Sequence, residues 1–192
     1  NETENLTFAV DGTGILKIEK APLTIKVENV NREYGAENPE LTVSYDGFVN
    51  GEDESVLGGE LKLSYDNIDK TTAVGTYTGA AKAEGQTSGN YEITYVYGDV
   101  EIVKIPVNVS TQTATETYLT IELDRAVEGL GQANFEIKDS DGNSVSLTNV
   151  IAAPGNQIYT LRGRFAAGRE YTVKITLDGI ADNETHRLVN DE

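Results

Sequence analysis

Residues 139–143, Asp-Ser-Asp-Gly-Asn, are the part of the sequence whose residue types and spacing come nearest to a ligand site. Alternating carboxylates followed by an amide begin like a calcium-binding loop, in which oxygen atoms surround the cation. The full pattern also needs a glycine at its sixth position and a bidentate glutamate at its twelfth, but here the glycine is fourth and Val150 is twelfth. We therefore predict a hairpin turn and no metal site, and Asp139 and Asp141 are the only candidate ligands that we retain.

His186 is the only histidine of the chain, and it limits the acid–base and metal chemistry that the protein can perform. Without cysteine, neither a disulfide framework nor a thiolate zinc site can form, and a site with two histidines is excluded as well. The Gly-x-Ser-x-Gly motif of a nucleophile elbow does not occur in the sequence. His186 lies in a polar context, Glu-Thr-His-Arg, and we interpret it as an exposed residue at the end of a strand.

Carboxylates are abundant, and glycosidase-type chemistry is the class that two of them could support. That chemistry needs two acids at a fixed separation in a cleft, usually beside aromatic platforms for the sugar. The chain has no Trp, and its tyrosines fall mostly on strand faces beside aliphatic residues, where they are typical of a core. The sequence therefore predicts no catalytic residue, no cofactor and no enzymatic activity.

The charge balance indicates which partners the chain avoids. With 32 acidic and 15 basic residues the formal net charge is −17, and both halves of the sequence are acidic. Such a field repels nucleic acid and anionic membrane surfaces. No apolar run is long enough for a transmembrane helix. We expect neither nucleic-acid binding nor membrane insertion, and we interpret the scattered charges as a means of staying soluble.

Alternating apolar and polar residues predict strands along almost the whole chain. In Tyr171–Leu177 every second residue is apolar, which is the pattern of a half-buried strand. Turn signals such as Asp-Gly and Asn-Gly separate the strand signals. Only residues 52–57 look helical, for about one turn. The same period-two pattern occurs at residues 23–27, 41–45, 61–65 and 119–123. The predicted fold class is all-β.

An internal repeat divides the chain. Lys20-Ala21-Pro22 and Lys104-Ile105-Pro106 lie 84 residues apart, each between two apolar strands. A period of that size corresponds to one small domain. Because proline cannot donate to a strand ladder, we interpret Lys-x-Pro as the seam between two domains. The predicted domains are residues 1–20, the closing hairpin of a preceding repeat; residues 21–104, one complete repeat; and residues 105–192, a domain of another kind.

The predicted hairpin would consist of Leu6–Val10 and Ile15–Lys20. An isolated hairpin is only marginally stable in water, so we expect it to pack on the sheet of the first domain or on a neighbouring molecule, with Phe8 buried. Because the sequence starts within this hairpin, we expect it to be a piece of a longer protein.

Residues 21–104 resemble the MBG family, the mostly-beta, glycine-rich repeats of bacterial surface and adhesin-like proteins. The resemblance covers nearly the whole segment with its motifs in order, and the family implies tandem arrays, an extracellular place and no catalytic residue. The motifs are Lys20–Ile25, Glu33-Tyr34-Gly35 with Asn38-Pro39, Gly47–Asp53, Gly75-Thr76-Tyr77 and Ser88–Ile93. We also expect the segment around Phe48 to be a loop that is tucked onto the core.

Residues 105–192 resemble bacterial immunoglobulin-like or fibronectin-type-III-like sandwich domains. Before Tyr171 the sequence Ala-Gly-Arg-Glu looks like the corner in which a tyrosine hydroxyl bonds back to nearby backbone, so we expect Tyr171 to be largely buried. The predicted strands are Val107–Ser110, Tyr118–Leu123, Phe135–Lys138, Ser144–Thr148, Ile158–Leu161, Tyr171–Leu177 and His186–Val189.

From these features we expect a non-catalytic structural module, a spacer or stalk in a bacterial cell-surface or cell-wall protein, outside the cell. Its expected partners are neighbouring domains of the same polypeptide. The alternative is an adhesin module that recognises a host, matrix or glycan ligand, such as an extracellular protein, through its loops. An exposed aromatic or apolar patch would favour binding, and the absence of such a patch would favour a spacer.

Overall fold

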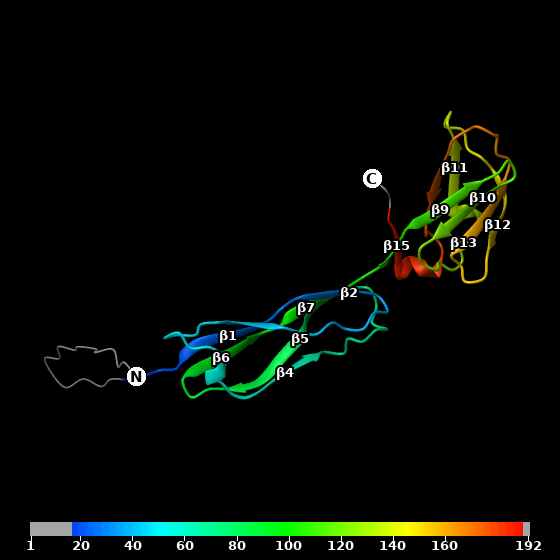
Figure 1. Ribbon diagram of the computed structural model, residues 1–192. Helices are drawn as coiled ribbons and strands as arrows, with labels where there is room; N and C mark the ends of the chain where they lie inside the picture. Colours follow the sequence, from blue (N-terminus) through cyan, green and yellow to red (C-terminus); the bar gives the residue numbers. More distant parts are fainter. Residues whose placement is uncertain (1–16, 190–192) are drawn as a thin grey trace, which may run out of the picture.

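The computed structural model describes residues 17–189, and in these residues the chain is all-β. Figure 1 shows two groups of strands that follow one another along an elongated molecule, as expected for tandem β domains. The strands of the first group are β1 (Ala21–Val27), β2 (Val30–Glu33), β3 (Val43–Asp46), β4 (Gly58–Tyr65), β5 (Gly75–Thr87), β6 (Tyr91–Val96) and β7 (Gly98–Val103). Those of the second group are β8 (Ile105–Val107), β9 (Val109–Ala114), β10 (Tyr118–Leu123), β11 (Phe135–Asp139), β12 (Leu147–Ala152), β13 (Ile158–Gly163), β14 (Tyr171–Ile175) and β15 (His186–Leu188).

Two sheets form the first domain, in the orders β3-β1-β6 and β2-β7-β5-β4. The first strands of the domain run parallel to its last strands: β1 pairs with β6, and β2 pairs with β7. The register is the same in both pairs, since Ala21 lies opposite Tyr91 and Val30 lies opposite Val100. The chain therefore enters the domain at one end of this parallel pair and leaves it at the other.

The core of the first domain comes from the alternation seen in the sequence. Leu23, Ile25 and Val27 of β1 are buried, as period two predicts. A cluster of buried residues joins Val27 to Val100 and Ile102 of β7 and to the small alanines of β5. The short helical prediction is confirmed as a single 3₁₀ turn, Glu54–Val56, in which the Asp53 side chain caps the Ser55 amide.

The second domain has a four-stranded sheet in the order β12-β13-β10-β9 and two strand pairs, β11-β14 and β8-β15. Its core is a separate cluster of buried residues. The four-stranded sheet contributes Ile121 of β10 and Leu161 of β13, and the β11-β14 pair contributes Ile137 of β11. Two further 3₁₀ turns lie at Gln132–Asn134 and Ala181–Glu184. Within the described residues, no helix is long and apolar enough to cross a membrane.

Two of the predicted strands of the second domain differ from the structure. The prediction Ser144–Thr148 was wrong in its limits: Ser144 and Val145 bond to the strand before them, and the chain then moves to pair with β13 as β12. The predicted Val107–Ser110 is divided between β8 and β9, which pair with different strands. In both places one apolar run serves two sheets, a change of partner that alternation alone cannot show.

The predicted hairpin of residues 1–20, including Phe8, falls mostly on residues 1–16, which lie outside the described residues. Of the remainder, Lys17–Lys20 is exposed, and the Ile18 side chain is 89% exposed. The packing expected for the hairpin stays a prediction.

Candidate functional site

The acidic loop is held by a guanidinium group. The Arg169 side chain lies 3.3 Å from Asp139 Oδ2 and 2.7 Å from Asp141 Oδ2. Asp139 also accepts the backbone amides of Asp141 and Asn143, as in a tight turn. The backbone bond from Asn143 is the main reason that the pKa of Asp139 lies below its usual value. In residues 17–189 no group of three or more His, Asp or Glu side chains is arranged to hold a metal ion.

His186 lies at the start of β15, half-buried, next to the seam between the domains. It pairs with Ile105 of β8, and its Nδ1 is 2.8 Å from Thr185 Oγ1. The expectation of an exposed histidine is therefore corrected to a half-buried one, because β15 is the strand that the incoming strand of the second domain pairs with.

Tyr171 makes the backbone contact that the sequence predicts. Its hydroxyl accepts the Ala166 amide at 2.6 Å, and its ring packs edge-on against Phe165, with centroids 5.3 Å apart. The residue is half-buried, however, and not largely buried as expected. It is the first residue of β14.

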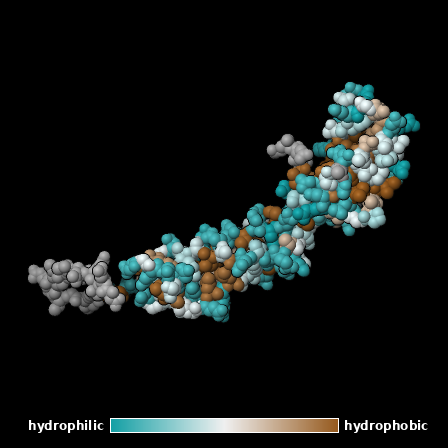
Figure 2. Space-filling view, in the orientation of Figure 1, coloured by the Kyte–Doolittle hydropathy of each residue, from teal (hydrophilic) through white to brown (hydrophobic). Residues whose placement is uncertain are grey.

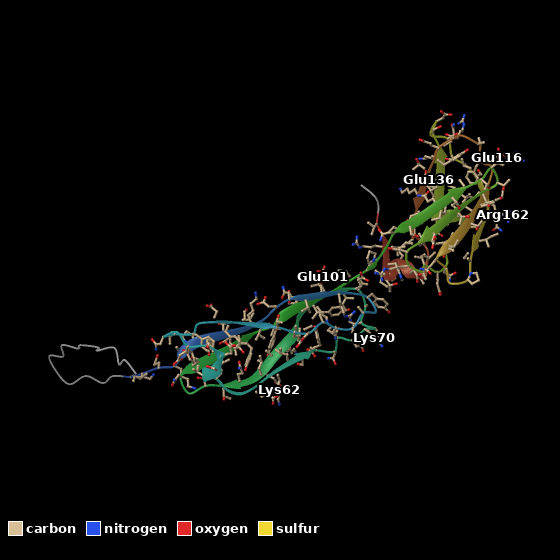
Figure 3. All side chains as sticks on the ribbon, viewed as in Figure 1. Lys62, Lys70, Glu101, Glu116, Glu136 and Arg162 are labelled. Atoms are coloured by element: carbon tan, nitrogen blue, oxygen red, sulfur yellow. The ribbon has the colours of Figure 1, made fainter. Side chains whose placement is uncertain are left out.

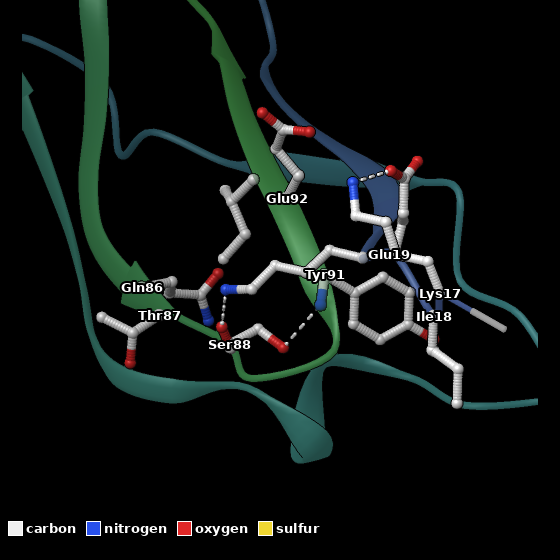
Figure 4. Close-up of a pocket in the computed structure, with 10 residues that line it drawn as sticks. Lys17, Ile18, Glu19, Gln86, Thr87, Ser88, Tyr91 and Glu92 are labelled. Atoms are coloured by element: carbon white, nitrogen blue, oxygen red, sulfur yellow. Dashed lines mark hydrogen bonds and ion pairs between the residues drawn. The ribbon is translucent and has the colours of Figure 1, made fainter. Parts of the chain in front are cut away.

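The end at which the chain enters the first domain carries a set of bonds that the sequence did not reveal. Lys20 Nζ donates to the Ser88 carbonyl at 2.7 Å, and the Ala21 amide donates to the Asn90 carbonyl at 2.9 Å. Ser88 Oγ in turn accepts the Tyr91 amide at 3.1 Å. Figure 4 shows the bonds of Ser88 to Lys20 and to Tyr91 beside an open hollow at this end of the domain, which is lined by Lys17–Lys20 and by the turn before β6.

The loop expected around Phe48 is tucked onto the core beside the same end. The Tyr91 ring meets Phe48 edge-on at 5.4 Å, and its hydroxyl donates to Glu52 at 2.5 Å while it accepts the Val49 amide. The bond to the Glu52 carboxylate raises the pKa of Tyr91. Gly47 brings the loop against β1: it has φ of +114°, and a Cβ there would lie 2.4 Å from the Pro22 oxygen.

Halfway along the domain the parallel pairing passes from the first sheet (β1 with β6) to the second (β2 with β7). A side chain bridges the two strands where the ladder is interrupted. Between β1 and β2 the side-chain oxygen of Asn29, Oδ1, accepts the Asp99 backbone amide at 2.8 Å. Gly98 allows the close approach, because a Cβ there would lie 2.6 Å from the Glu28 oxygen. The two strands thus stay bonded where the regular ladder is interrupted.

The end at which the chain leaves the first domain is built around a buried cation. Arg32, 7% exposed, donates to Asn38 Oδ1 at 2.8 Å and to the carbonyls of Glu33 and Asp69. Asn38 also donates to the Ile68 carbonyl at 2.7 Å. All these partners are neutral oxygens, so they satisfy the guanidinium without a buried ion pair. This network explains the Asn-Pro motif, but sequence reasoning missed Arg32 because nothing local distinguishes it from a surface arginine.

The seam itself contains a single residue, Lys104, between β7 and β8. Lys104 Nζ donates to the Asn183 carbonyl, and the Ile105 amide donates to the Thr185 carbonyl at 2.7 Å. Across the seam, Arg125 of the second domain forms an ion pair of 3.3 Å with Glu33 at the end of β2. The arrangement can fix one domain relative to the next, and it offers no activated nucleophile or acid–base pair among these residues.

The motifs of the first domain are those of a known family. Residues 23–101 match the family described as MBG domain (YGX type). In the structure its Tyr-Gly element is the turn after β2: the Tyr34 amide donates to the Val103 carbonyl, and Gly35 has φ of +79°. MBG domains are non-catalytic repeats and occur in surface proteins. A search of curated proteins found no match to the sequence. Residues 23–101, most of the first domain, are therefore similar to the MBG domains of the YGX type.

Proposed function

We propose that the chain is a spacer, or stalk, module of a bacterial cell-surface protein. The observation that supports this most directly is the parallel pairing of the first and last strands of the first domain, from Ala21 opposite Tyr91 to Glu33 opposite Val103. Because both strands run the same way, the point of entrance and the point of exit lie at opposite ends of the domain. At ~3.3 Å per residue the pair spans roughly 40 Å. Domains in tandem then extend a chain instead of folding back.

The short seam supports the same function. With only Lys104 between two paired strands, few backbone angles are free to bend. The Arg125–Glu33 ion pair adds a contact across the seam, although both side chains are more than a third exposed and salt will screen it.

The surface suits an extracellular spacer, and we place the module outside the cell. Figure 2 shows hydrophilic residues over most of the visible face, with hydrophobic areas between them. Charged side chains lie on both domains, among them Lys62 and Glu101 on the first and Glu116 and Arg162 on the second (Figure 3). A net charge of −17 makes neighbouring stalks repel one another. The partners are then the adjoining domains of the same polypeptide, and the module performs no catalysis and needs no cofactor.

An immunoglobulin-like sandwich is our proposal for the second domain. Its buried cluster lies between β10 and β13 on one side and β11 on the other, and the Tyr171 hydroxyl bonds back to Ala166. The parallel pairing of its first strand, β8, with its last described strand, β15, matches the arrangement in the MBG domain.

The test of the spacer is the stiffness of the seam. Because the chain has no cysteine, spin labels can be placed by single substitutions, at Lys62 in the first domain and Glu136 in the second. We expect pulsed electron resonance to give a narrow distance distribution, close in width to that of a control pair within the first domain, Lys62 and Glu101. A broad distribution, or a compact folded-back particle in small-angle X-ray scattering, would contradict the proposal.

An adhesin module is the second candidate. The observation in its favour is that Val49 and Val56, on the connection between β3 and β4, are 45% and 46% exposed. Such side chains could contact a protein or glycan ligand at the end of the first domain away from the seam. Binding of the full chain to an array of matrix proteins and glycans, lost in Val49→Ser/Val56→Ser, would establish this function. If no such binding is detected on the array, the spacer remains the only function that we propose.

A further inference from the structure

We infer that the paired first and last strands of each domain form a mechanical clamp that resists stretching of the chain, and that the first domain resists more than the second. This inference rests on the proposed spacer function, because only a protein held at both ends is stretched. Its subject is the strength of each domain, whereas the spacer proposal concerns the stiffness of the seam.

The direction of the strands relative to the pull is the first step. A force along the chain reaches the first domain at Lys20 and leaves it at Val103. It draws β1 toward one end and β7 toward the other, while β1/β2 and β6/β7 lie side by side and parallel. The strands must therefore slide past each other, and the bonds that cross between them are loaded together. In the opposite geometry, in which a strand is peeled from one end, the bonds break one at a time.

The continuity of the bonds is the second step. At the point of entrance, Lys20 and Ala21 bond to the turn before β6. The ladder then runs from Ala21 to Lys26, Asn29 bridges to Asp99 at the break, and the ladder resumes from Val30 to Glu33. At the exit, the Tyr34 amide bonds to Val103. Bonds between the two strands are therefore distributed from the entrance of the domain to its exit.

The difference between the domains is the third step. Within the described residues of the second domain, the parallel ladder extends from Ile105 to Val107, opposite His186 to Leu188. Three bonds flank it: Lys104 Nζ to the Asn183 carbonyl, the Ile105 amide to the Thr185 carbonyl, and the Val189 amide to the Val107 carbonyl. The next strand, β9, pairs with β10 and not with the last strand. Fewer bonds share the load, so this domain should yield at a lower force.

The experiment compares two pulling directions on the same domain by single-molecule force spectroscopy. Handles on Lys17→Cys and Thr113→Cys load the first domain in shear, and handles on Lys17→Cys and Gly89→Cys peel β1 from β6. Lys17, Thr113 and Gly89 are exposed, and a Cβ at Gly89 meets nothing within 4 Å. Both double variants must first have the same melting midpoint as the parent protein. If the variant with Gly89→Cys does not, the handle is attached at the exposed Asn90 instead. The length of chain that is released in an unfolding event identifies the first domain. Only residues 105–113 of the second domain lie between the handles, and they can release only a short segment.

We expect the shear direction to need roughly twofold or more force than the peeling direction, because forced unfolding follows the barrier along the direction pulled. When the full chain is pulled from its two ends, we expect an additional, weaker event from the second domain. Equal forces in the two directions would overturn the clamp while leaving the spacer in place. An additional event stronger than that of the first domain would overturn the ranking.

Discussion

Lys20 and Lys104 make the same contact in two different folds. Each ammonium donates to the carbonyl that lies three residues before the strand with which the incoming strand pairs: Ser88 before Tyr91, and Asn183 before His186. The next amide, of Ala21 or Ile105, bonds two residues further on in both domains. The repeated Lys-x-Pro thus marks a common way of starting a domain, in which lysine fixes the turn and proline is the second residue of the parallel strand.

Replacing either lysine by methionine, which keeps most of the stem, should destabilise only the domain that it opens. We expect about 0.5 kcal/mol for each substitution, the size of a partly exposed charged hydrogen bond. Hydrogen exchange resolved by peptide measures the two domains separately in the full chain. The exposed Lys62→Met is the control. Faster exchange in both domains after Lys20→Met would mean that the contact does not act locally.

Gly47→Ala should destabilise the first domain by about 2–4 kcal/mol, because the added methyl group meets backbone in a strained conformation. The obstacle is the Pro22 oxygen at 2.4 Å, and the strain comes from φ of +114°. Gly51 is the matched control in the same loop: its φ is +73°, but a Cβ there meets nothing within 4 Å. Gly51→Ala should cost only about 1 kcal/mol. If urea unfolding gave the same loss of free energy of unfolding for Gly47→Ala and Gly51→Ala, the close contact of Gly47 with β1 would be unimportant for stability.

The parts of the fold that follow from local pattern were predictable, and those that depend on distant pairing were not. Tyr118–Leu123 is β10 as predicted, because its alternation faces one core along its whole length. The parallel pairing of Ala21 with Tyr91 has no local signature, since any apolar strand could fill that place. Lys20 was noticed only as part of a repeat, and its partner, the Ser88 carbonyl, is a backbone group that no sequence pattern identifies. Asn29 and Arg32 were missed for the same reason.

Tyr171→Phe should destabilise the second domain by about 1 kcal/mol through loss of the bond from the Ala166 amide. The half-buried position of the ring leaves its packing on Phe165 intact in the variant. Tyr118→Phe, at a tyrosine that is 38% exposed, is the control. Hydrogen exchange at Ala166 should rise in the first variant and not in the second. An unchanged rate there would count against a stabilising corner.

Calcium should leave the melting midpoint unchanged relative to a chelator, apart from small screening effects. Arg169 already neutralises the pair formed by Asp139 and Asp141, and its guanidinium lies where a cation would have to sit. Arg169→Ala makes the test more stringent, because the variant lacks the guanidinium that occupies the place of a cation but keeps the carboxylates of Asp139 and Asp141. A rise of several degrees with calcium in the parent protein would identify these residues as a metal site.

The last prediction concerns the effect of acid on the connection between β8 and β9, where Asn108 lies. Asp124 accepts the side-chain amide of Asn108 at 2.7 Å and its backbone amide at 2.8 Å, and these bonds lower the pKa of Asp124 below 3.8. A carboxyl whose pKa is lower in the folded state binds its proton more tightly in the unfolded chain, so its contribution to stability is present above pH 3.8 and lost as the pH falls through the folded value.

Asp124→Asn removes that titration and places an amide against the amide of Asn108. The difference in free energy of unfolding between parent and variant should therefore have its largest value at neutral pH and decrease only below about pH 4. Taking the difference cancels the relief of general repulsion that any acidic protein gains in acid. The exposed Glu170→Gln removes the same charge without the Asn108 bonds and should show no such step. A parent–variant difference that stays constant from pH 7 to pH 2 would mean that the Asp124 bonds do not depend on its charge.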